Sequence, residues 1–445
     1  METKLLRIAE LAKSDPKMKF TSIVHLLNKQ SLVQCHLELP NKKATGINGT
    51  TKEQYSETLE ENIEDLVSRL KSKSYHPVPV RRMYIPKLNS NKKRPLGIPE
   101  HEDKIVQKGI TKILNAIYEN DFLDCSFGFR PNRNCHDALK ILNYYMEKKS
   151  VNYIVDVDIK GFFDNVDHIW MMEFLKLRIA DPNLLRIIGR FLKAGYMEEG
   201  KKYKTDKGTP QGGVVSPILA NLYLHYVLDL WFEKEVRRKC KGHAYIVRYA
   251  DDFVCCVCCF QYKSEAQEFF QSLKLRLQKF NLEIAEDKTK IIPFGRFAEK
   301  DAKLKGNGKP DTFDFLGFTH YCGKSKSGYF RVKWKSSRKK LQGKLKESKE
   351  WIKNNRNNGI HMIMDRFKRS LIGYYNYYCI MDNTPSVHRF KDKIQYLLFR
   401  WLNRRSQRKS FTWDKFNLFL HKYPLPSPRI KVNIYDLRKE ISYIL

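Results

Sequence analysis

The feature that most constrains the fold is the tetrapeptide Tyr249-Ala250-Asp251-Asp252, which stands between two apolar runs. Residues 244–247 and 253–257 are rich in the β-branched and aromatic residues that favour strands, so we expect a β-hairpin with two carboxylates at its turn. Neighbouring side chains of a strand point to opposite faces, but at a turn both reach a shared cation. Such a pair suits Mg²⁺, which prefers hard oxygen ligands. A solvated turn is the alternative interpretation.

The charge of the chain points to a polyanionic partner. Its 445 residues carry a formal net charge of +34, far more than solubility requires. From Cys322 to the C-terminus, 30 Lys and Arg residues stand against 8 Asp and Glu residues, a net charge of +22. We therefore expect nucleic acid as the partner and the last quarter of the chain as its main electrostatic footprint.

Composition sets the class of protein. The chain is 42% hydrophobic and long enough for two or three domains. It contains no run of about 18 apolar residues and no apolar signal-peptide core, so we expect a soluble, cytoplasmic protein without membrane contact. Strand alternation splits the four cysteines of residues 255–259 between two faces, which argues against a zinc site there and favours free thiols.

A second hairpin is expected near the N-terminal third of the chain, after about 75 largely helical residues. Residues 80–87 and 94–99 read as its strands, so Lys87 and Arg94 flank its tip. There a lysine can act as a point charge and an arginine as a fork for a triphosphate. A solvated basic tip remains the alternative.

A third carboxylate is expected from the buried strand 153–158. Packed beside the hairpin of Asp251, this strand would bring Asp158 to the aspartate pair, and three carboxylates around two metals satisfy charge and ligand count. Alternation places Asp156 on the same face, and Asp164 is a further possibility. Spacing leaves the choice open.

Three further stretches have helix or boundary signals. The glycine-rich loop 207–213 precedes Ser216-Pro217, which has the form of an N-cap followed by proline at the first helical position. Residues 301–311 have the turn-forming composition of a domain boundary. Ser337 is expected to cap a helix whose outer face is basic, and basic helices with nearby aromatic residues suit a nucleic-acid backbone.

Taken in order, seven motifs resemble those of the reverse transcriptases encoded by bacterial and organellar group II introns. The matching strings are residues 44–49 (ATGING), 85–87 with 94–99 (IPK and RPLGIP), 126–131 (SFGFRP), 158–164 (DIKGFFD), 208–213 (GTPQGG), 249–252 (YADD) and 315–318 (FLGF). Each string is a weak signal alone. Their order along nearly the whole chain makes the resemblance specific.

The resemblance implies an α+β fold: a right-hand polymerase with fingers, an antiparallel palm and a helical thumb, plus a helical N-terminal extension. We expect the extension in residues 1–78, fingers and palm in 79–300, the thumb or maturase domain in 311–400 and a basic nucleic-acid-binding segment in 401–445. The chain resembles the subset of the family without an endonuclease domain, since it has no His-Asn-His constellation and no paired-cysteine metal site after Trp401.

By the same resemblance the residues acquire roles. Asp158, Asp251 and Asp252, with the backbone carbonyl of Ile159, would bind two Mg²⁺ ions, which selects Asp158 over Asp156. The residues that would hold the deoxynucleoside triphosphate are Lys87, Arg94, Phe163 and Gln211, with Phe163 crowding a ribose 2′-hydroxyl. The basic residues that would hold nucleic acid are Lys339, Lys340, Lys344, Arg404 and Arg405. Asn48 departs from the family, which usually has Asp there.

The resemblance therefore implies an RNA-directed DNA polymerase that also binds its intron RNA as a splicing maturase. Its expected partners are the group II intron RNA, an RNA template with a DNA or RNA primer, and target DNA, without an obligatory protein partner. The alternatives are a non-catalytic RNA-binding maturase and a free-standing reverse transcriptase used in defence or repair. Three intact carboxylates argue against the first, because they repel one another without metal.

Overall fold

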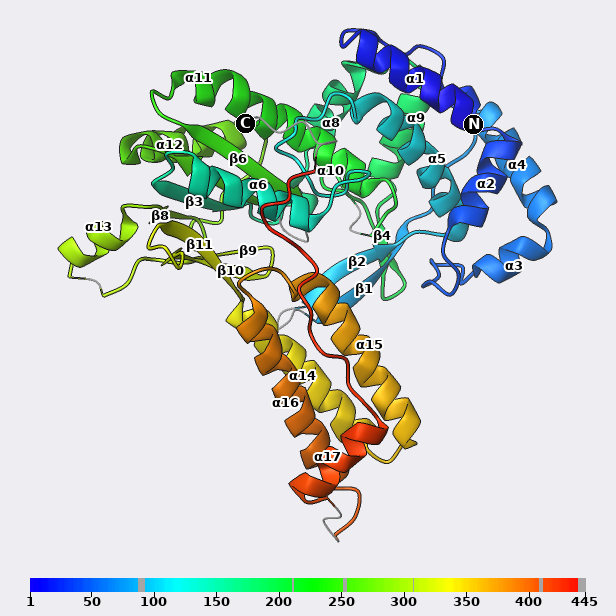
Figure 1. Ribbon diagram of the computed structural model, residues 1–445. Helices are drawn as coiled ribbons and strands as arrows, with labels where there is room; N and C mark the ends of the chain where they lie inside the picture. The colour runs from blue at the N-terminus through cyan, green and yellow to red at the C-terminus, as the bar shows by residue number, and fades with distance from the viewer. Residues whose placement is uncertain (87–92, 210–211, 251–253, 307, 408–410, 439–445) are drawn as a thin grey trace.

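The computed structural model describes residues 1–86, 93–209, 212–250, 254–306, 308–407 and 411–438, without the side chains of residues 250 and 254–258. Figure 1 shows a body of mixed helices and sheets, from which a bundle of long helices projects. The architecture is α+β, as expected. Among the described residues no helix is long and apolar enough to cross a membrane.

The N-terminal part is helical, as expected, and packs on the long helix α5 (His101–Tyr118). Its helices are α1 (Glu2–Ser14), α2 (Lys29–Glu38), α3 (Lys52–Glu57) and α4 (Leu59–Lys71), with a 3-10 turn at Val24–Leu26. The carboxylate of Asp181 accepts hydrogen bonds from the backbone N–H groups of Ile23 and Val24, both at 2.8 Å. This buried carboxylate ties the N-terminal part to the start of a later helix.

The second predicted hairpin is confirmed and belongs to a larger sheet. Strands β1 (Val80–Pro86) and β2 (Lys93–Ile98) are antiparallel, with Ile85 opposite Arg94. The short strands β4 (Tyr196–Glu198) and β5 (Lys201–Tyr203) extend it, giving the order β2-β1-β4-β5 with β1 and β4 parallel. Residues 196–203 are thereby joined to the β1–β2 hairpin, about 100 residues earlier in the chain.

The hairpin around the aspartate pair is also confirmed, in the central sheet of the body. Strands β6 (Ala244–Ala250) and β7 (Val254–Phe260) are antiparallel, and β7 pairs with β3 (Tyr153–Asp158). With β8 (Lys290–Pro293) the order is β6-β7-β3-β8, and every neighbouring pair is antiparallel. Helices α6 (Cys135–Lys148) and α12 (Lys263–Lys279) pack on this sheet.

A helical layer joins the sheet to the N-terminal part. It contains α7 (Phe162–Asn165), α8 (His168–Lys176), α9 (Pro182–Leu192) and α10 (Ser216–Leu224). Ser216 is the first residue of α10 and Val215 its N-cap, so the predicted cap was wrong by one residue. The helix continues as π-helical turns His225–Asp229 and Phe232–Val236 into α11 (Arg237–Lys239).

A three-stranded sheet that the sequence did not suggest connects the body to the projecting helices. Its order is β11-β10-β9, with β9 at Phe313–Phe315, β10 at Phe318–Lys324 and β11 at Phe330–Ser336. The expected boundary segment 301–311 begins inside a helix, α13 (Ala298–Leu304). Ser337 is the N-cap residue of the helix that follows, as predicted, but its side chain makes no capping hydrogen bond; its hydroxyl donates to Asp314 at 2.9 Å.

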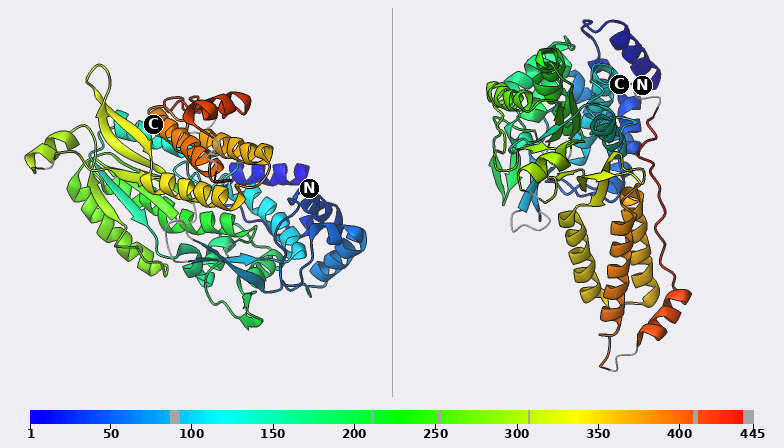
Figure 2. Two further views of the ribbon diagram at one scale, coloured as in Figure 1. Left: turned by 90° about the horizontal axis from the view of Figure 1, so that it is seen from below. Right: turned by 60° about the vertical axis from the view of Figure 1, so that its left-hand side comes forward.

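The projection consists of α14 (Arg338–Asn355), α15 (Ile360–Tyr378) and α16 (Thr384–Leu402), with α17 (Trp413–Lys422) at its far end (Figures 1 and 2). Phe367, Phe390 and Phe416 lie in its own hydrophobic core. The C-terminal segment then runs back along the projection to the body, where the Arg438 guanidinium donates to the Asn132 carbonyl oxygen at 2.7 Å. The C-terminal segment therefore contacts both the projection and the body.

Candidate active site

The end of β3 brings Asp158 to the end of the β6–β7 hairpin. Asp158 lies opposite Cys255 of β7, and Cys255 lies opposite Tyr249 of β6. The described ends of β6 and β7, at Ala250 and Val254, therefore stand beside Asp158. Asp251 and Asp252 lie outside the described residues.

The carboxylate of Asp158 has one oxygen engaged and one unsatisfied. Its Oδ2 accepts a hydrogen bond from Lys288 Nζ at 2.8 Å, whereas its Oδ1 is buried without a hydrogen-bond partner among the described residues. The Asp158 backbone is held on both sides, because its N–H donates to the Thr289 hydroxyl and its carbonyl accepts from Ala285 at 2.8 Å. A buried oxygen without a partner fits a cation ligand.

The neighbouring Ile159 offers a second oxygen. Its flanking residues hold the strand in place, since Lys160 N–H donates to the Glu283 carbonyl at 2.9 Å. No described residue donates a hydrogen bond to the Ile159 carbonyl oxygen itself. Within the described part of the chain no three metal-ligating side chains cluster, so a complete site would need the aspartate pair. The oxygens that are present fit a hard cation such as Mg²⁺.

The two competing aspartates have different surroundings. Burial, followed by the charges of Asp158 and Asp314, raises the pKa of Asp156 to about 7. Asp156 thus lies on the same face as Asp158, as alternation predicts, but deeper within the sheet, opposite Lys290. Asp164 lies on α7, is exposed and lines a neighbouring cavity. Of the three, Asp158 stands at the strand end beside the hairpin.

Arg248 is a functional-site residue that the sequence analysis missed. It lies on β6, three residues before Asp251, and its side chain is fully buried. Its guanidinium binds both oxygens of the equally buried Asp229 at 2.8 and 2.7 Å, and also donates to Asn221 at 3.0 Å and to the Ser126 hydroxyl at 2.6 Å. One charge in the middle of an apolar strand was the available signal.

The side-chain partners of Arg248 come from three separate segments of the chain. Ser126 begins the SFGFRP loop, Asn221 lies on the helix after the GTPQGG loop, and Asp229 lies on the π-helical turn. The backbone repeats the connection, because Phe127 N–H donates to the Arg248 carbonyl at 2.9 Å and Arg248 N–H to that of Cys125 at 2.7 Å. Arg248 therefore fixes the hairpin of Asp251 relative to these loops.

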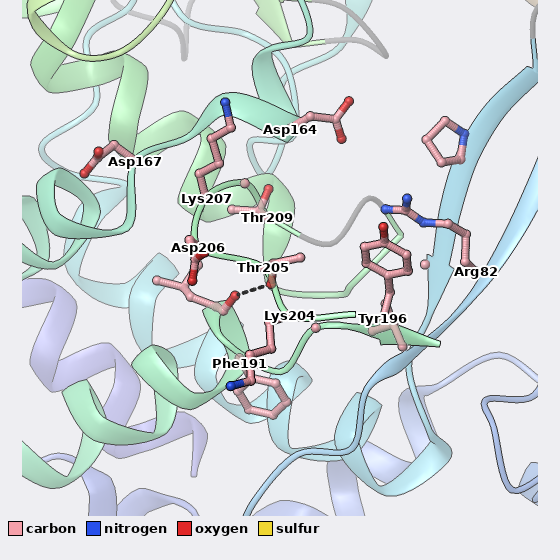
Figure 3. A pocket seen from close by; sticks show the side chains of 16 residues that line it. Arg82, Asp164, Asp167, Phe191, Tyr196, Lys204, Thr205, Asp206, Lys207 and Thr209 are labelled. Atoms are coloured by element: carbon pink, nitrogen blue, oxygen red, sulfur yellow. Dashed lines mark hydrogen bonds between the residues drawn. The ribbon is translucent and has the colours of Figure 1, made fainter. Parts of the chain in front are cut away.

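A cavity of about 630 Å³ lies between the sheet β2-β1-β4-β5 and the loop 204–209, with Asp164 of α7 among its lining residues (Figure 3). We call it the site cavity; the residues that line it include Arg82, Gly97, Asp164, Tyr196, Lys204, Lys207 and Thr209. The Arg82 guanidinium lies 3.4 Å from the centre of the Tyr196 ring. Three cations, Arg82, Lys204 and Lys207, and three carboxylates, Asp164, Asp167 and Asp206, line this cavity, so its charges balance.

The loop 208–209 is fastened to α7. Thr209 N–H donates to the Phe163 carbonyl at 2.8 Å, and Gly208 N–H to that of Val166 at 2.7 Å. Gly208 has a φ of +89°, and a Cβ there would lie 2.9 Å from the Phe163 carbonyl oxygen, so only glycine permits this approach. Phe163 is 7% exposed and belongs to the hydrophobic core.

Of the other predicted nucleotide-binding residues, Arg94 lies within the described part of the chain. Lys87 and Gln211 lie outside the described residues. Arg94 is half-buried and is the second residue of β2, so it lies at the tip end of the β1–β2 hairpin. Gly212 follows the undescribed pair 210–211, and a Cβ there would lie 2.6 Å from the Gly97 carbonyl oxygen. The GTPQGG loop thus touches the return strand of that hairpin.

The predicted nucleic-acid residues differ in what their charges do. Lys339 and Lys340 are exposed on α14, whereas Lys344 forms an ion pair with Glu347 at 2.9 Å. The Arg404 guanidinium lies over the Trp401 ring at 4.9 Å. Arg405 donates to the backbone carbonyls of Arg356 and Asn358. Arg405 therefore holds the end of α14 in place within the chain itself.

The loop with Asn48 is held by its backbone. Asn48 N–H donates to the Glu100 carboxylate at 2.5 Å, and Lys104 Nζ donates to the Ala44 carbonyl at 2.8 Å. A Cβ at Gly46 would lie 2.4 Å from Glu100 Oε1, which explains the glycine. A negative side chain at position 48 is not needed for this attachment, since Glu100 supplies the charge.

Comparison with known proteins agrees with this geometry. Residues 85–320, about half of the chain, match the reverse transcriptase (RNA-dependent DNA polymerase) family, and residues 338–419 match the group II intron maturase-specific domain. The group II intron-encoded protein LtrA of Lactococcus lactis subsp. cremoris is 42% identical over 231 residues, 51% of this chain and 38% of LtrA. The chain thus spans well under half of that relative's length.

Another relative is matched along most of its length. Protein YkfC of Escherichia coli (strain K12) is 31% identical over 364 residues, which are 73% of this chain and 90% of YkfC. A plant protein, nuclear intron maturase 2 of Arabidopsis thaliana mitochondria, is 25% identical over 178 residues, 31% of this chain and 24% of that protein. The chain therefore belongs to the reverse transcriptase family and carries a group II intron maturase-specific domain.

Proposed function

We propose that the chain is the RNA-directed DNA polymerase of a group II intron element and also binds its intron RNA as a splicing maturase. The observation that carries the proposal is Asp158, placed by β3 at the end of the hairpin of Asp251 and Asp252 with one buried oxygen unpartnered. The family matches and the name of LtrA support it. We assign the extension to residues 1–78, fingers and palm to 79–300, the thumb to 311–400 and the basic segment to 401–445.

The proposed metal ligands are Asp158, Asp251 and Asp252 with the Ile159 carbonyl oxygen. Two Mg²⁺ ions bound there would activate the primer 3′-hydroxyl and neutralise the charge of the triphosphate and of the leaving pyrophosphate. The chain supplies a fixed ligand, because Thr289 and Ala285 hold the Asp158 backbone. Lys288 Nζ balances the charge of Asp158 and has to share or release Oδ2 when a cation binds.

The proposed nucleotide site lies where the β1–β2 hairpin borders the site cavity. Lys87 and Arg94 hold the triphosphate, and Gln211 lies near the incoming nucleotide. Phe163 restricts space at the ribose 2′ position, so deoxynucleotides are preferred. The attachment of Thr209 N–H to the Phe163 carbonyl supports this assignment, because it brings the GTPQGG loop against the Phe163 backbone.

The proposed RNA surface is the projection together with the C-terminal basic segment. Residues from Cys322 onward carry a net charge of +22, and Lys339 and Lys340 expose their side chains on α14. Released counterions would drive binding to intron RNA, to the template–primer duplex and to target DNA. A maturase without catalysis would keep this surface but would have no use for the Asp158 arrangement.

Primer extension on an RNA template with Mg²⁺ and deoxynucleotides tests the proposal. Asp251→Ala should abolish extension while leaving RNA affinity within about twofold, because a metal ligand contributes several kcal/mol to transition-state stabilisation and little to phosphate binding. Extension by the Asp251→Ala variant at the parental rate would refute the metal assignment. Intron splicing that persists in this variant would show that polymerase and maturase activities are separable; a parent that splices without extending primers would support the non-catalytic alternative.

A further inference from the structure

A second hollow of about 580 Å³ lies on the outer side of α9, and we call it the α9 groove. Its lining residues include His76, Met172, Leu185, Arg186, Arg190, Lys193 and Lys202. Four of these side chains are Arg or Lys, and among the described residues that line it there is no Asp or Glu. The floor between the cations is apolar. The groove is therefore built for an anion that also presents flat, uncharged surface.

One cation builds the wall, while others are left for a ligand. The Arg190 guanidinium donates to the backbone carbonyls of Lys73 and Tyr75, at 2.8 and 2.5 Å, and so fixes the segment that carries His76. Lys193 and Lys202 are exposed and form no ion pair within the described ranges, whereas His76 Nδ1 lies 2.8 Å from the Ser74 carbonyl oxygen. A charge that has no internal partner is available to a phosphate.

The α9 groove and the site cavity share one structural partition. The segment that connects the end of α9 to β4 lines both hollows. Lys193 and Ala194 line the α9 groove, and the residues that line the site cavity are Phe191, Leu192, Gly195 and Tyr196. The strand β5 continues the partition: Lys202 lines the groove, while its neighbour Tyr203 stacks on Tyr196, with ring centres 5.0 Å apart. Since β5 is the edge strand of its sheet, a flexible chain can pass around it from one hollow to the other.

We propose that the α9 groove binds single-stranded RNA, namely the part of the template that has not yet been copied. This inference rests on the proposed polymerase function, because the template must reach the proposed active site at Asp158. Unpaired bases expose flat faces that pack on an apolar floor such as Leu185 and Met172, whereas a duplex presents mainly phosphates. The phosphates of this segment contact Lys193 and Lys202.

The test compares two charge-neutralised double variants of the full chain. Lys193→Gln with Lys202→Gln removes two groove cations. Lys201→Gln with Lys13→Gln removes the same charge from exposed positions that line neither hollow. The probes are a labelled RNA template annealed to a DNA primer, with either a long single-stranded 5′ overhang or an overhang of one nucleotide.

The groove variant should bind the long-overhang probe about fivefold to tenfold more weakly than the control variant, and the one-nucleotide probe equally well. Two lost contacts should also reduce the slope of log affinity against log salt by about 1.4, at about 0.7 for each single-strand phosphate. Equal affinities of the two variants for the long overhang would overturn the proposal. So would a loss of equal size on both probes, since the groove would then contact the duplex.

Two further arms separate the possible causes. If the groove variant loses affinity for intron RNA but keeps that for the long overhang, the groove serves intron RNA and the template assignment is overturned. Binding is measured without deoxynucleotides, so it reads the groove even if the parent fails to extend a primer. That failure would refute the polymerase function, while an overhang-specific loss of affinity would still show a single-strand site.

Discussion

The buried pair of Arg248 and Asp229 gives a quantitative prediction for the centre of the molecule. Both side chains are inaccessible to solvent, and four hydrogen bonds converge on the Arg248 guanidinium. Arg248→Met preserves the length of the side chain but leaves the Asp229 carboxylate buried without its counter-charge. Removal of one partner of a buried pair costs about 3–5 kcal/mol, because the remaining charge is uncompensated.

The double variant Arg248→Met with Asp229→Leu should recover most of this loss. It removes the orphaned charge and replaces the pair by apolar groups of similar size, a change that is often nearly neutral. The remaining cost should come from Asn221 and Ser126, which each lose a partner, at about 1 kcal/mol per hydrogen bond. The two single changes should therefore be strongly non-additive.

Urea unfolding followed by circular dichroism measures these differences. Arg237→Met is the matched control, because Arg237 pairs with Glu233 at 2.5 Å while both side chains remain about one-third exposed. Exposed pairs contribute at most about 1 kcal/mol, so this variant should stay close to the parent. If Arg248→Met costs no more than the control, or if the double variant is as unstable as Arg248→Met, the account of this pair is wrong.

Three other predictions concern pH, selectivity and salt. Burial raises the pKa of Asp103 to about 7, above its value of about 3.9 in an unfolded chain, so its contribution to the free energy of unfolding falls from about pH 4 to about pH 7 and is level above. The stability difference between the parent and Asp103→Asn should therefore shrink from about pH 4 to about pH 7 in urea unfolding and stay level above that; an unchanged difference would contradict the shift. Phe163→Val should increase ribonucleotide incorporation in primer extension, and an unchanged preference would refute the steric role. Lys339→Gln with Lys340→Gln should weaken RNA binding and lower the slope of log affinity against log salt by about 1.4 to 1.8, as expected for two lost phosphate contacts. A slope equal to that of the parent would exclude these contacts.

The two hairpins could be predicted because local signals determine them. Alternating apolar residues on either side of a polar turn specify both strands and their antiparallel register, and residues 80–98 and 244–260 carry that pattern. The pairing of β3 with β7 was expected from the need to gather carboxylates, and the register confirms it. The choice of Asp158 over Asp156 needed the family resemblance, since alternation places both on one face.

Other features escaped because their causes are not local. Strands β4 and β5 have three residues each, two of the latter lysines, and exist because β1 offers an edge to pair with. Ser337 stands at the predicted N-cap position, but its hydroxyl donates to Asp314 and accepts no capping hydrogen bond from the helix. Arg248 is a single charge in an apolar strand, and only the fold shows that Asp229, 19 residues earlier in the chain, compensates its charge.

The most direct test of the active-site assignment compares aspartates in one assay. The rate of RNA-templated primer extension at saturating Mg²⁺ is measured for Asp158→Ala and for Asp164→Ala, whose carboxylate is exposed on α7 and lines the site cavity. Asp158→Ala should lose several orders of magnitude in rate, because a metal ligand is lost, while Asp164→Ala should retain the parental rate within about tenfold. Extension by Asp158→Ala at the parental rate, or loss of activity only in Asp164→Ala, would contradict the account.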